Sequence, residues 1–493
     1  MELRLNRERV DCYACMMDRT TEDTFSVDIV IPDSLPDAAN VVLTDGDFCL
    51  WRLDLSSGSA EAEGEWKGSA CYTAEDTGSI HSFPVSAGVR LRITDERIVP
   101  EHRPYAEIRV CEVSGQLMNS RKMRLRVRVS MHLQLYASGD MEITAWPESV
   151  PDDLHFLTAP KQITVISAVE EQVFTAGDRI PLSGETECKL LSVHSRIVTD
   201  QALTRGSGAI LNGTVIAELL CENELTGTLY TQTAETTFSQ LLDISADAKD
   251  DLLPHVHLTS ADVRPTGDGA VITEYHFVVQ TLCMRHLQLS VPVDAYSVRD
   301  QLEISTEQLS CHDRTTVQAV TAYADAETSI SPDSKVIMCS ATLLRPFQFQ
   351  DGMQKSVLSV SVMYADQANA VASLHETVPI AVEAEAHETV TSVEMQAADV
   401  QIKNGKLHIL IPVVIDKTAE TDSSVTQICE IKRVGVDPEK QKLPAVTLVR
   451  RECMNDLWSA AKQFCSSEEA IRAANPELET SDSAFILIPR QYA

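Results

Sequence analysis

Strict alternation of apolar and polar residues is the main pattern along this chain. From residue 123 to residue 135 every second residue is apolar, and the residues between them are basic or polar. The apolar set is Met123, Leu125, Val127, Val129, Met131, Leu133 and Leu135. A period of two over this length predicts a long antiparallel strand with one buried face and one wet face. Residues 406–415 repeat the pattern, and because Pro412 has no amide hydrogen we expect an edge strand or a bulge there.

Three segments of the chain share one order of strand and turn features, which indicates an internal repeat. Two sets of anchor residues recur at intervals of roughly 140 to 150 residues. The first set is Tyr72, Cys221 and Tyr364, and the second is Val113, Val263 and Val400. We therefore predict a mainly β fold with three tandem antiparallel β-sandwich or barrel-like domains, over residues 1–150, 151–297 and 298–437. Proline-bearing polar stretches at 146–153, 291–300 and 436–444 are the expected linkers.

Residues 443–493 depart from this pattern and predict a small βααβ unit. Residues 446–449 and 485–488 read as short strands. Leu457, Ala460, Ala461 and Phe464 recur at helical spacing. Ser466 and Glu469 form a capping box for a second helix, in which Ala470, Ile471 and Ala474 face inward and which Pro476 ends. Trp458 lies within the apolar stripe of the first helix, so we expect it to pack in a core.

Composition and charge narrow the classes of function. The chain has 493 residues and a net charge of −32, which opposes binding to nucleic acid and to anionic membranes. No apolar stretch is long enough to span a bilayer, so no membrane insertion is expected. The charged start of the chain does not resemble a signal peptide, which predicts a cytoplasmic location. The 13 cysteines have no framework spacing and are interpreted as small buried hydrophobes in a reducing compartment.

Few residues suggest redox or metal chemistry. Cys12 and Cys15 form a Cys-x-x-Cys pair, but no second Cys/His pair and no helix start lies nearby, so an incidental role is favoured. His255 and His257 would point to the same side of a strand, as metal ligands do, but no third ligand is evident. The pair at 311–312, a cysteine and a histidine, is a weaker signal. We expect neither a metal nor a cofactor.

Two charged stretches each allow a structural and a functional interpretation. The basic ladder, defined as Arg121, Lys122, Arg124, Arg126 and Arg128, is either a solvated strand face paired with acidic neighbours, which is favoured, or a dock for an acidic partner. Residues 28–37 contain three aspartates, Asp28, Asp33 and Asp37. Their two prolines favour a structural turn over a calcium site, which needs denser oxygen donors and a glycine bend.

Motifs of the common catalytic sites are lacking from the sequence. It contains no glycine-rich phosphate loop, no His-Glu-x-x-His and no Gly-x-Ser-x-Gly. With 73 acidic residues, any proposed pair of catalytic carboxylates is uninformative. We therefore expect a protein that is not an enzyme.

The last fifty residues resemble a LysM domain. Leu457, Trp458, Ala461, Ile471, Ala474, Asn475, Ile488 and Pro489 match its pattern. The Gly-Asp-Thr turn of that family is replaced by residues 454–456, and the Pro-Gly turn before its last strand is replaced by residues 480–484. Both turns flank the groove that holds N-acetylglucosamine chains, and lost glycines remove easy access to positive φ. The resemblance implies the LysM fold, and the departures argue against its sugar site.

The remainder resembles the SPOCS domain of spore-forming Clostridia, most clearly at residues 28–37 and 119–125. SPOCS repeats followed by a LysM domain are the layout of the SipL-like spore coat assembly family. The resemblance implies a mother-cell scaffold that links coat layers to the forespore surface through a polymerising ATPase. The expected partner-binding residues of the tail are Asn455, Asp456, Leu457, Asn475 and Pro476. The alternative is a protein that binds peptidoglycan through its LysM domain.

Overall fold

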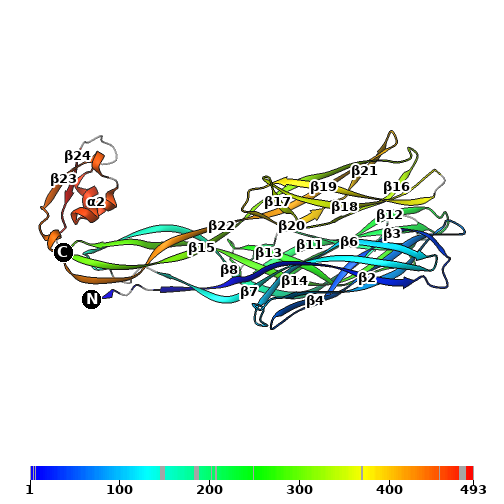
Figure 1. Cartoon of the computed structure of the whole chain (residues 1–493), viewed down its shortest axis with the longest axis horizontal. Coiled ribbons are helices and arrows are strands. Elements are labelled where there is room, and N and C mark those ends of the chain that lie inside the picture. The colour runs from blue at the N-terminus through cyan, green and yellow to red at the C-terminus, as the bar shows by residue number, and fades with distance from the viewer. Residues whose placement is uncertain are drawn as a thin grey trace.

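The computed structural model describes residues 2–3, 5, 7–144, 150–182, 188–200, 202–205, 208–247, 249–367, 370–454, 456–476 and 485–491, with no side chains at 2, 3, 310–313, 422 and 423. The protein is mainly β, as the alternation predicts, and its sheets are antiparallel. Figure 1 shows a body of packed sheets from which a narrow bundle of long strands extends toward the two chain ends.

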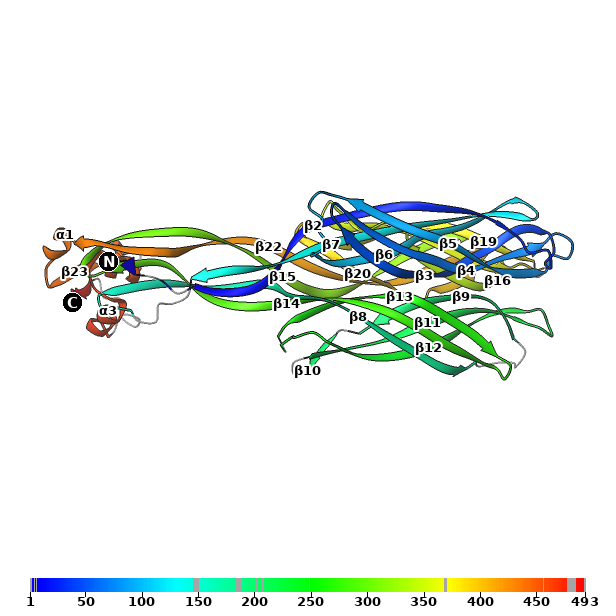
Figure 2. The same cartoon turned by 90° about the horizontal axis from the view of Figure 1, so that it is seen from below.

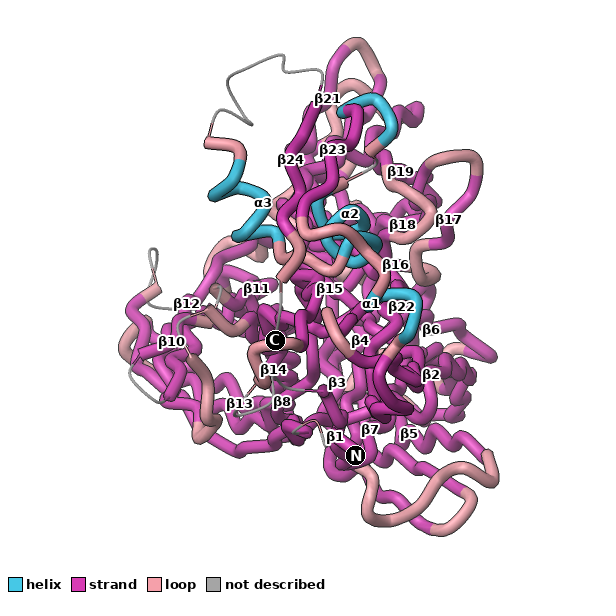
Figure 3. The backbone as a smooth tube through the Cα atoms, turned by 90° about the vertical axis from the view of Figure 1, so that its left-hand side faces the viewer, coloured by secondary structure: helices cyan, strands magenta, loops and turns pink. Residues whose placement is uncertain are grey.

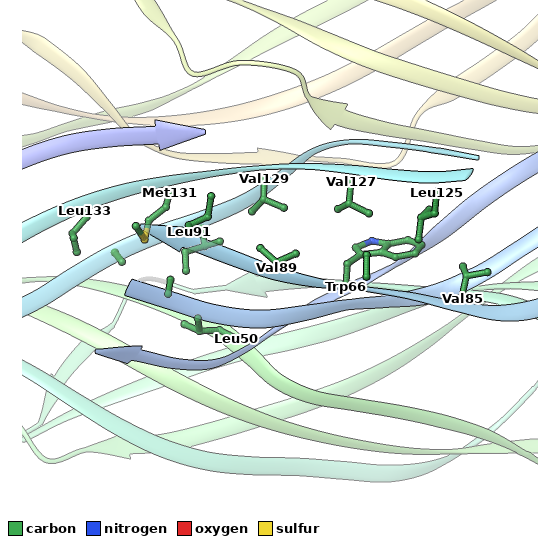
Figure 4. Close-up of a cluster of buried hydrophobic side chains, with 14 of the residues drawn as sticks. Leu50, Trp66, Val85, Val89, Leu91, Leu125, Val127, Val129, Met131 and Leu133 are labelled. Carbon is green, nitrogen blue, oxygen red and sulfur yellow. The ribbon is translucent and has the colours of Figure 1, made fainter. Parts of the chain in front are cut away.

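The first group of strands forms two facing sheets. It comprises β2 (Arg7–Val30), β3 (Ala38–Ser56), β4 (Ser59–Ala74), β5 (Ile80–Thr94), β6 (Arg103–Asn119) and β7 (Lys122–Thr144). Strands β3, β4 and β5 make a short sheet, and β2, β7 and β6 pair in a long one. The seven apolar residues of the 123–135 alternation are fully buried in the core between the sheets, beside Trp66 of β4 (Figure 4). The predicted long strand with one buried face is confirmed.

Two further groups repeat this arrangement. The second comprises β8 (Leu154–Pro181), β9 (Cys188–Thr199), β10 (Leu203–Arg205), β11 (Gly208–Asn223), β12 (Leu229–Leu242), β13 (Asp251–Thr266) and β14 (Ala270–Ser297). The third comprises β15 (Asp300–Ser329), β16 (Lys335–Leu343), β17 (Gln348–Gln350), β18 (Met353–Ala365), β19 (Val371–Glu383), β20 (Glu388–Met395), β21 (Asp399–Lys403) and β22 (Lys406–Val436). The first anchor set, Tyr72, Cys221 and Tyr364, lies in β4, β11 and β18, the middle strands of the three short sheets.

The long strands of the three groups form a shared stalk, seen on the left of Figure 1 and Figure 2. It contains the N-terminal halves of β2, β8 and β15 and the C-terminal halves of β7, β14 and β22. Small apolar clusters fill it, and they include Leu5, Ile143, Ile163, Ala295, Leu309, Ile428 and Ile431. Strand β2 meets β8 within one six-stranded sheet, and β1 (Glu2–Leu3) pairs with β22. The groups therefore lie side by side around one stalk rather than in a row.

The edge-strand alternative for Pro412 is wrong, whereas the bulge alternative agrees with the pairing, in which residues 396–398 lie opposite residues 411 and 412 between β20 and β21. Pro412 lies in β22, which has neighbours on both sides, so it is not in an edge strand. The Pro412 carbonyl accepts from the amide of Gln396, which lies between β20 and β21. The amide and the carbonyl of one residue point to the same side of an antiparallel strand. The amide hydrogen that Pro412 lacks would therefore also face this interruption, and no ladder bond is lost.

The stretch 291–300, an expected linker, connects the second group to the third. It contains the end of β14, with Tyr296 and Ser297 buried, followed by a tight turn into β15.

The C-terminal segment forms a small unit at the end of the stalk. It contains α1 (Pro438–Gln441), β23 (Val446–Arg450), a 3₁₀ turn at Arg451–Cys453, α2 (Leu457–Phe464), α3 (Glu468–Ala474) and β24 (Phe485–Pro489). Strands β23 and β24 pair antiparallel, and both helices pack beside them (Figure 3). We call residues 443–493 the tail.

Candidate functional site

The tail is packed against the stalk. The indole Nε1 of Trp458 donates to Asp294 Oδ2 at 2.8 Å, and the Lys462 ammonium lies 2.7 Å from the same carboxylate. The Trp458 ring packs on the Tyr296 ring with a centroid separation of 4.8 Å. The Tyr296 hydroxyl donates to the carbonyl of Ser466 at 2.8 Å. Trp458 therefore packs, as its position in the apolar stripe predicts, and it joins the tail to β14.

The two tail helices lie where the spacing predicts them, but the second begins one residue later. Ala460, Ala461 and Ile471 are buried in the tail core. The N-cap of α3 is Ser467, whose hydroxyl accepts from the amide of Ala470. The predicted capping box is therefore wrong. The preceding serine is fully buried and donates to a carbonyl of β24, so tertiary contact and not helix capping determines its role.

The predicted partner-binding residues of the tail are mostly occupied by the tail's own structure. Asp456 is the N-cap of α2, where its carboxylate accepts from the amide of Ser459 at 2.7 Å. The Asn475 side chain bonds to both the amide and the carbonyl of Leu487, at 2.9 and 2.6 Å, and so fixes β24 to α3.

The other three predicted positions differ in exposure. Leu457 is half-buried against the tail core. Pro476 is exposed. Asn455 lies outside the described residues.

The outer face of the two-stranded β23–β24 sheet is an exposed apolar surface that the sequence reasoning missed. Val446 is 51% exposed, Leu448 65% and Phe485 50%. They share one face, because their strand neighbours at 447, 449, 486 and 488 point toward the tail core or lie closer to it. Arg450 lies over the Phe485 ring, 5.9 Å from its centroid. The available signal was that these strands are apolar at both parities, so that one apolar face remains outside the tail core.

The basic ladder lies on the opposite face of β7 from the core and is largely neutralised. Asp28 of β2 lies 2.7 Å from Arg124 and 2.9 Å from Lys122, and these cations hold its pKa well below the usual range. Arg128 pairs with two glutamates on the neighbouring strands, at 2.9 and 3.1 Å. Arg126 is exposed and has no ion pair with the described residues. This pairing favours the structural interpretation of the ladder.

Arg121 connects residues 28–37 with residues 119–125. Its guanidinium donates to the carbonyls of Leu35 and Pro32 and lies 3.2 Å from the carboxylates of both Asp33 and Asp37. The loop at 31–37 is a hydrogen-bonded turn, as its prolines predict. An arginine therefore takes the central position that a cation would need among these oxygens.

The cysteine candidates lie on long strands. Cys12 and Cys15 are in β2, and burial raises the pKa of each thiol, which disfavours the reactive thiolate. Cys311 and His312 lie in β15, and their side chains are outside those described. In the described ranges no group of three or more His, Cys, Asp or Glu side chains is arranged to hold a metal ion.

His255 and His257 close the gap between the two edge strands of the six-stranded sheet. The Nε2 atom of His257 donates to the carbonyl of Ala106 on β6 at 2.8 Å, and Gln280 Oε1 accepts from the amide of Ala106 at 2.8 Å. Burial lowers the pKa of His257 to about 4, so its ring stays neutral. The His255 ring stacks on Tyr105 with a centroid separation of 4.5 Å. These side chains satisfy edge groups that would otherwise be unpaired.

A central cavity of about 500 Å³ lies where the three groups meet. Its wall includes β3 and β6 of the first group, β9 and β13 of the second, and β16, β18, β19 and β20 of the third. Hydrogen bonds join each pair of groups around it. They include those from Ser195 N to Asp47 Oδ1 (2.6 Å), from Thr342 Oγ1 to Cys111 O (3.2 Å), and from Arg196 Nη1 to Met395 O (3.4 Å).

A buried ionic cluster forms part of the cavity wall. The Nδ1 atom of His194 lies 3.4 Å from Asp45 Oδ1 and 3.5 Å from Asp47 Oδ1. Burial raises the pKa of Asp47 to about 6, although His194 opposes the shift. Burial lowers the pKa of His194, but the two carboxylates outweigh it and raise the pKa to about 9. Two aspartates flanking Gly46 inside an apolar strand were a usable signal, but their histidine partner is 147 to 149 positions away.

No family model, curated protein or solved structure matches this chain. Within the described ranges, none of the helices is both long enough and apolar enough to cross a lipid bilayer.

Proposed function

We propose that the protein is a non-enzymatic scaffold of spore coat assembly in the mother-cell cytoplasm. Its LysM-like tail would dock a coat morphogenetic ATPase at the forespore surface, and its three SPOCS-like groups would act as the body of the scaffold. The motifs of the tail and of residues 28–37 and 119–125 support this proposal by resemblance. The observation that carries it is the exposed apolar face of the tail, placed at the end of the stalk.

The exposed face of the β23–β24 sheet is suited to a protein partner. Leu448 and Phe485 are large apolar side chains that stay at least half exposed, and such patches mark interaction sites. Residues 443–451 and 485–491 contain three arginines and no carboxylate, in a chain with a net charge of −32. Charge complementarity favours a partner whose apolar contact surface has an acidic rim.

Rigid attachment of the tail also supports a scaffold. The contacts of Trp458 and Lys462 with Asp294 fix the tail relative to the stalk, so a partner held there takes a defined position relative to the body. Deletion of the tail would uncover Tyr296 and Val298, which belong to the shared core. Point substitutions on the exposed face are therefore the sharper test.

The test measures binding of the full chain to the purified coat morphogenetic ATPase by calorimetry. Leu448→Asp should weaken binding at least about tenfold, because it places a carboxylate in the apolar contact. Leu225→Asp, at an exposed leucine on a turn of the body, is the matched control and should bind as the wild type does. Equal affinity of wild type and Leu448→Asp would remove the proposed docking surface.

Two further measurements separate the proposal from its alternative. A fluorescent fusion should gather around the forespore in sporulating cells, and a fusion that stays diffuse would contradict the scaffold role. Titration with chitin oligomers should give the same result for the full chain and for a variant at Pro476. Saturable binding that a substitution at Pro476 abolishes would instead favour the peptidoglycan-binding alternative.

A further inference from the structure

One wall of the central cavity is a patch of hydroxyl groups from the third group. In the β16–β18 ladder Ser340 lies opposite Ser361, and Thr342 lies opposite Ser359. All four line the cavity, whereas the alternate β18 positions Leu358, Val360 and Val362 are buried in the core of the third group. The three serine hydroxyls make no hydrogen bond to the described residues. The β16–β18 sheet thus presents unused donors and acceptors to the cavity.

The first and second groups contribute charged acceptors and donors to the same cavity. Asp45 and Asp47 bring carboxylates, and Asp45 Oδ2 is buried without a hydrogen-bond partner among the described residues. His194 lies between them and keeps 29% of its side chain exposed. An unpaired buried oxygen is destabilising, so a donor that reached it would stabilise it. The wall also contains Arg109 and Arg196, and these pair with the carboxylates of Glu107 and Glu218.

These walls select for one kind of ligand. A cavity of about 500 Å³ falls within the range of small-molecule sites. An apolar ligand would leave the serine hydroxyls and Asp45 unpaired, and an anion would find the arginines of the wall already paired with carboxylates. A neutral polyol has hydroxyls that donate to Asp45 and also accept from His194 and the serines. We propose that the central cavity binds a polyhydroxylated small molecule of mono- or disaccharide size.

This site is separate from the docking face of the tail, because the cavity lies in the body and Leu448 lies in the β23–β24 sheet. The two proposals therefore fail independently. Loss of ATPase binding leaves sugar binding in place, and the reverse also holds.

Calorimetric titration of the full chain with glucose, N-acetylglucosamine and trehalose tests the proposal. At least one of these sugars should bind saturably. Ser361→Leu should weaken that binding at least about tenfold, because the larger side chain fills the cavity and removes a hydroxyl. Asp45→Asn should weaken it as well, because a neutral amide is a weaker acceptor for sugar hydroxyls than a carboxylate.

Ser373→Leu is the matched control. Ser373 lies in β19 of the same short sheet but does not line the cavity, so this variant should bind as the wild type does. Circular dichroism checks that each variant folds. The absence of binding heat for all three sugars would mean that the cavity holds only water and would overturn the proposal. Unchanged affinity in folded Ser361→Leu and Asp45→Asn would also overturn it.

Discussion

The interior of the first group is built from apolar side chains, whereas the wall of the central cavity combines apolar side chains with charged and hydroxyl-bearing ones. The interior contains a row of fully buried aliphatic residues from β7 together with Trp66 of β4. The polar side chains of the cavity wall include the ionic cluster around His194 and the hydroxyl groups of the β16–β18 ladder. Within a group, non-directional apolar packing is enough to hold two sheets together. Between groups, directional polar contacts fix how the sheets meet, because each buried polar atom needs a particular partner.

The largest expected effect tests the apolar side of this comparison. Leu133→Ala removes a fully buried side chain and should lower the free energy of unfolding by about 3 kcal/mol through lost transfer energy and a residual cavity. Chemical denaturation of both proteins measures the difference. Arg126→Ala, on the exposed face of the same strand, should change stability little. Equal losses for the two variants would show that β7 does not have one buried face.

The pH dependence of stability tests the polar side. The pKa of His194 is raised from 6.5 to about 9, so its stabilising contribution is complete below pH 6.5 and is lost as the pH rises toward 9. Over that window the loss should reach at most about 3 kcal/mol.

The measurement is the free energy of unfolding at several pH values for wild type and His194→Gln. The variant should show a flatter decline, and His276→Gln, at an exposed histidine, should keep the wild-type slope. A wild-type decline that persists unchanged in His194→Gln would assign the effect to other groups.

The joint between tail and stalk should show a smaller effect. Asp294→Asn keeps an acceptor for the Trp458 indole but removes the attraction to Lys462, so it should cost about 1 kcal/mol. Hydrogen exchange should then rise in α2 and leave the exchange of β7 unchanged. Uniform exchange across both elements would contradict a local joint. Lys442→Gln, at an exposed lysine outside this joint, is the control.

The smallest effect belongs to the basic ladder. Arg124→Ala removes an exposed ion pair with Asp28, so the melting temperature should change within experimental error. Arg121→Ala is the contrasting variant, because Arg121 also donates to backbone carbonyls of the 31–37 turn, and it should lower the melting temperature measurably. The reverse order would mean that the ladder and not the turn contributes the stability.

Local patterns predicted individual strands and helices well, but they did not predict which elements pack against one another. The β7 alternation and the apolar spacing from Leu457 to Phe464 identified a strand and a helix, because burial of one face imposes the period. The helix start at Ser467 was misplaced by one residue, because two adjacent serines have similar capping propensity and only the contact with β24 distinguishes them. The exposed face of the β23–β24 sheet was missed because its strands are apolar on both faces, so the pattern does not indicate which face is buried.

The sequence by itself determined the mainly β character, the long one-faced strands and the two tail helices, since each follows from the period of apolar residues along a short stretch. Tertiary structure decided what faces what. The cluster of Asp45 and His194, the closure of β6 by His257 and the docking of Trp458 on Asp294 join residues more than 140 positions apart. A polar residue in a strand pattern indicates a face exposed to water. Only the fold determines whether water or a buried polar partner contacts that residue.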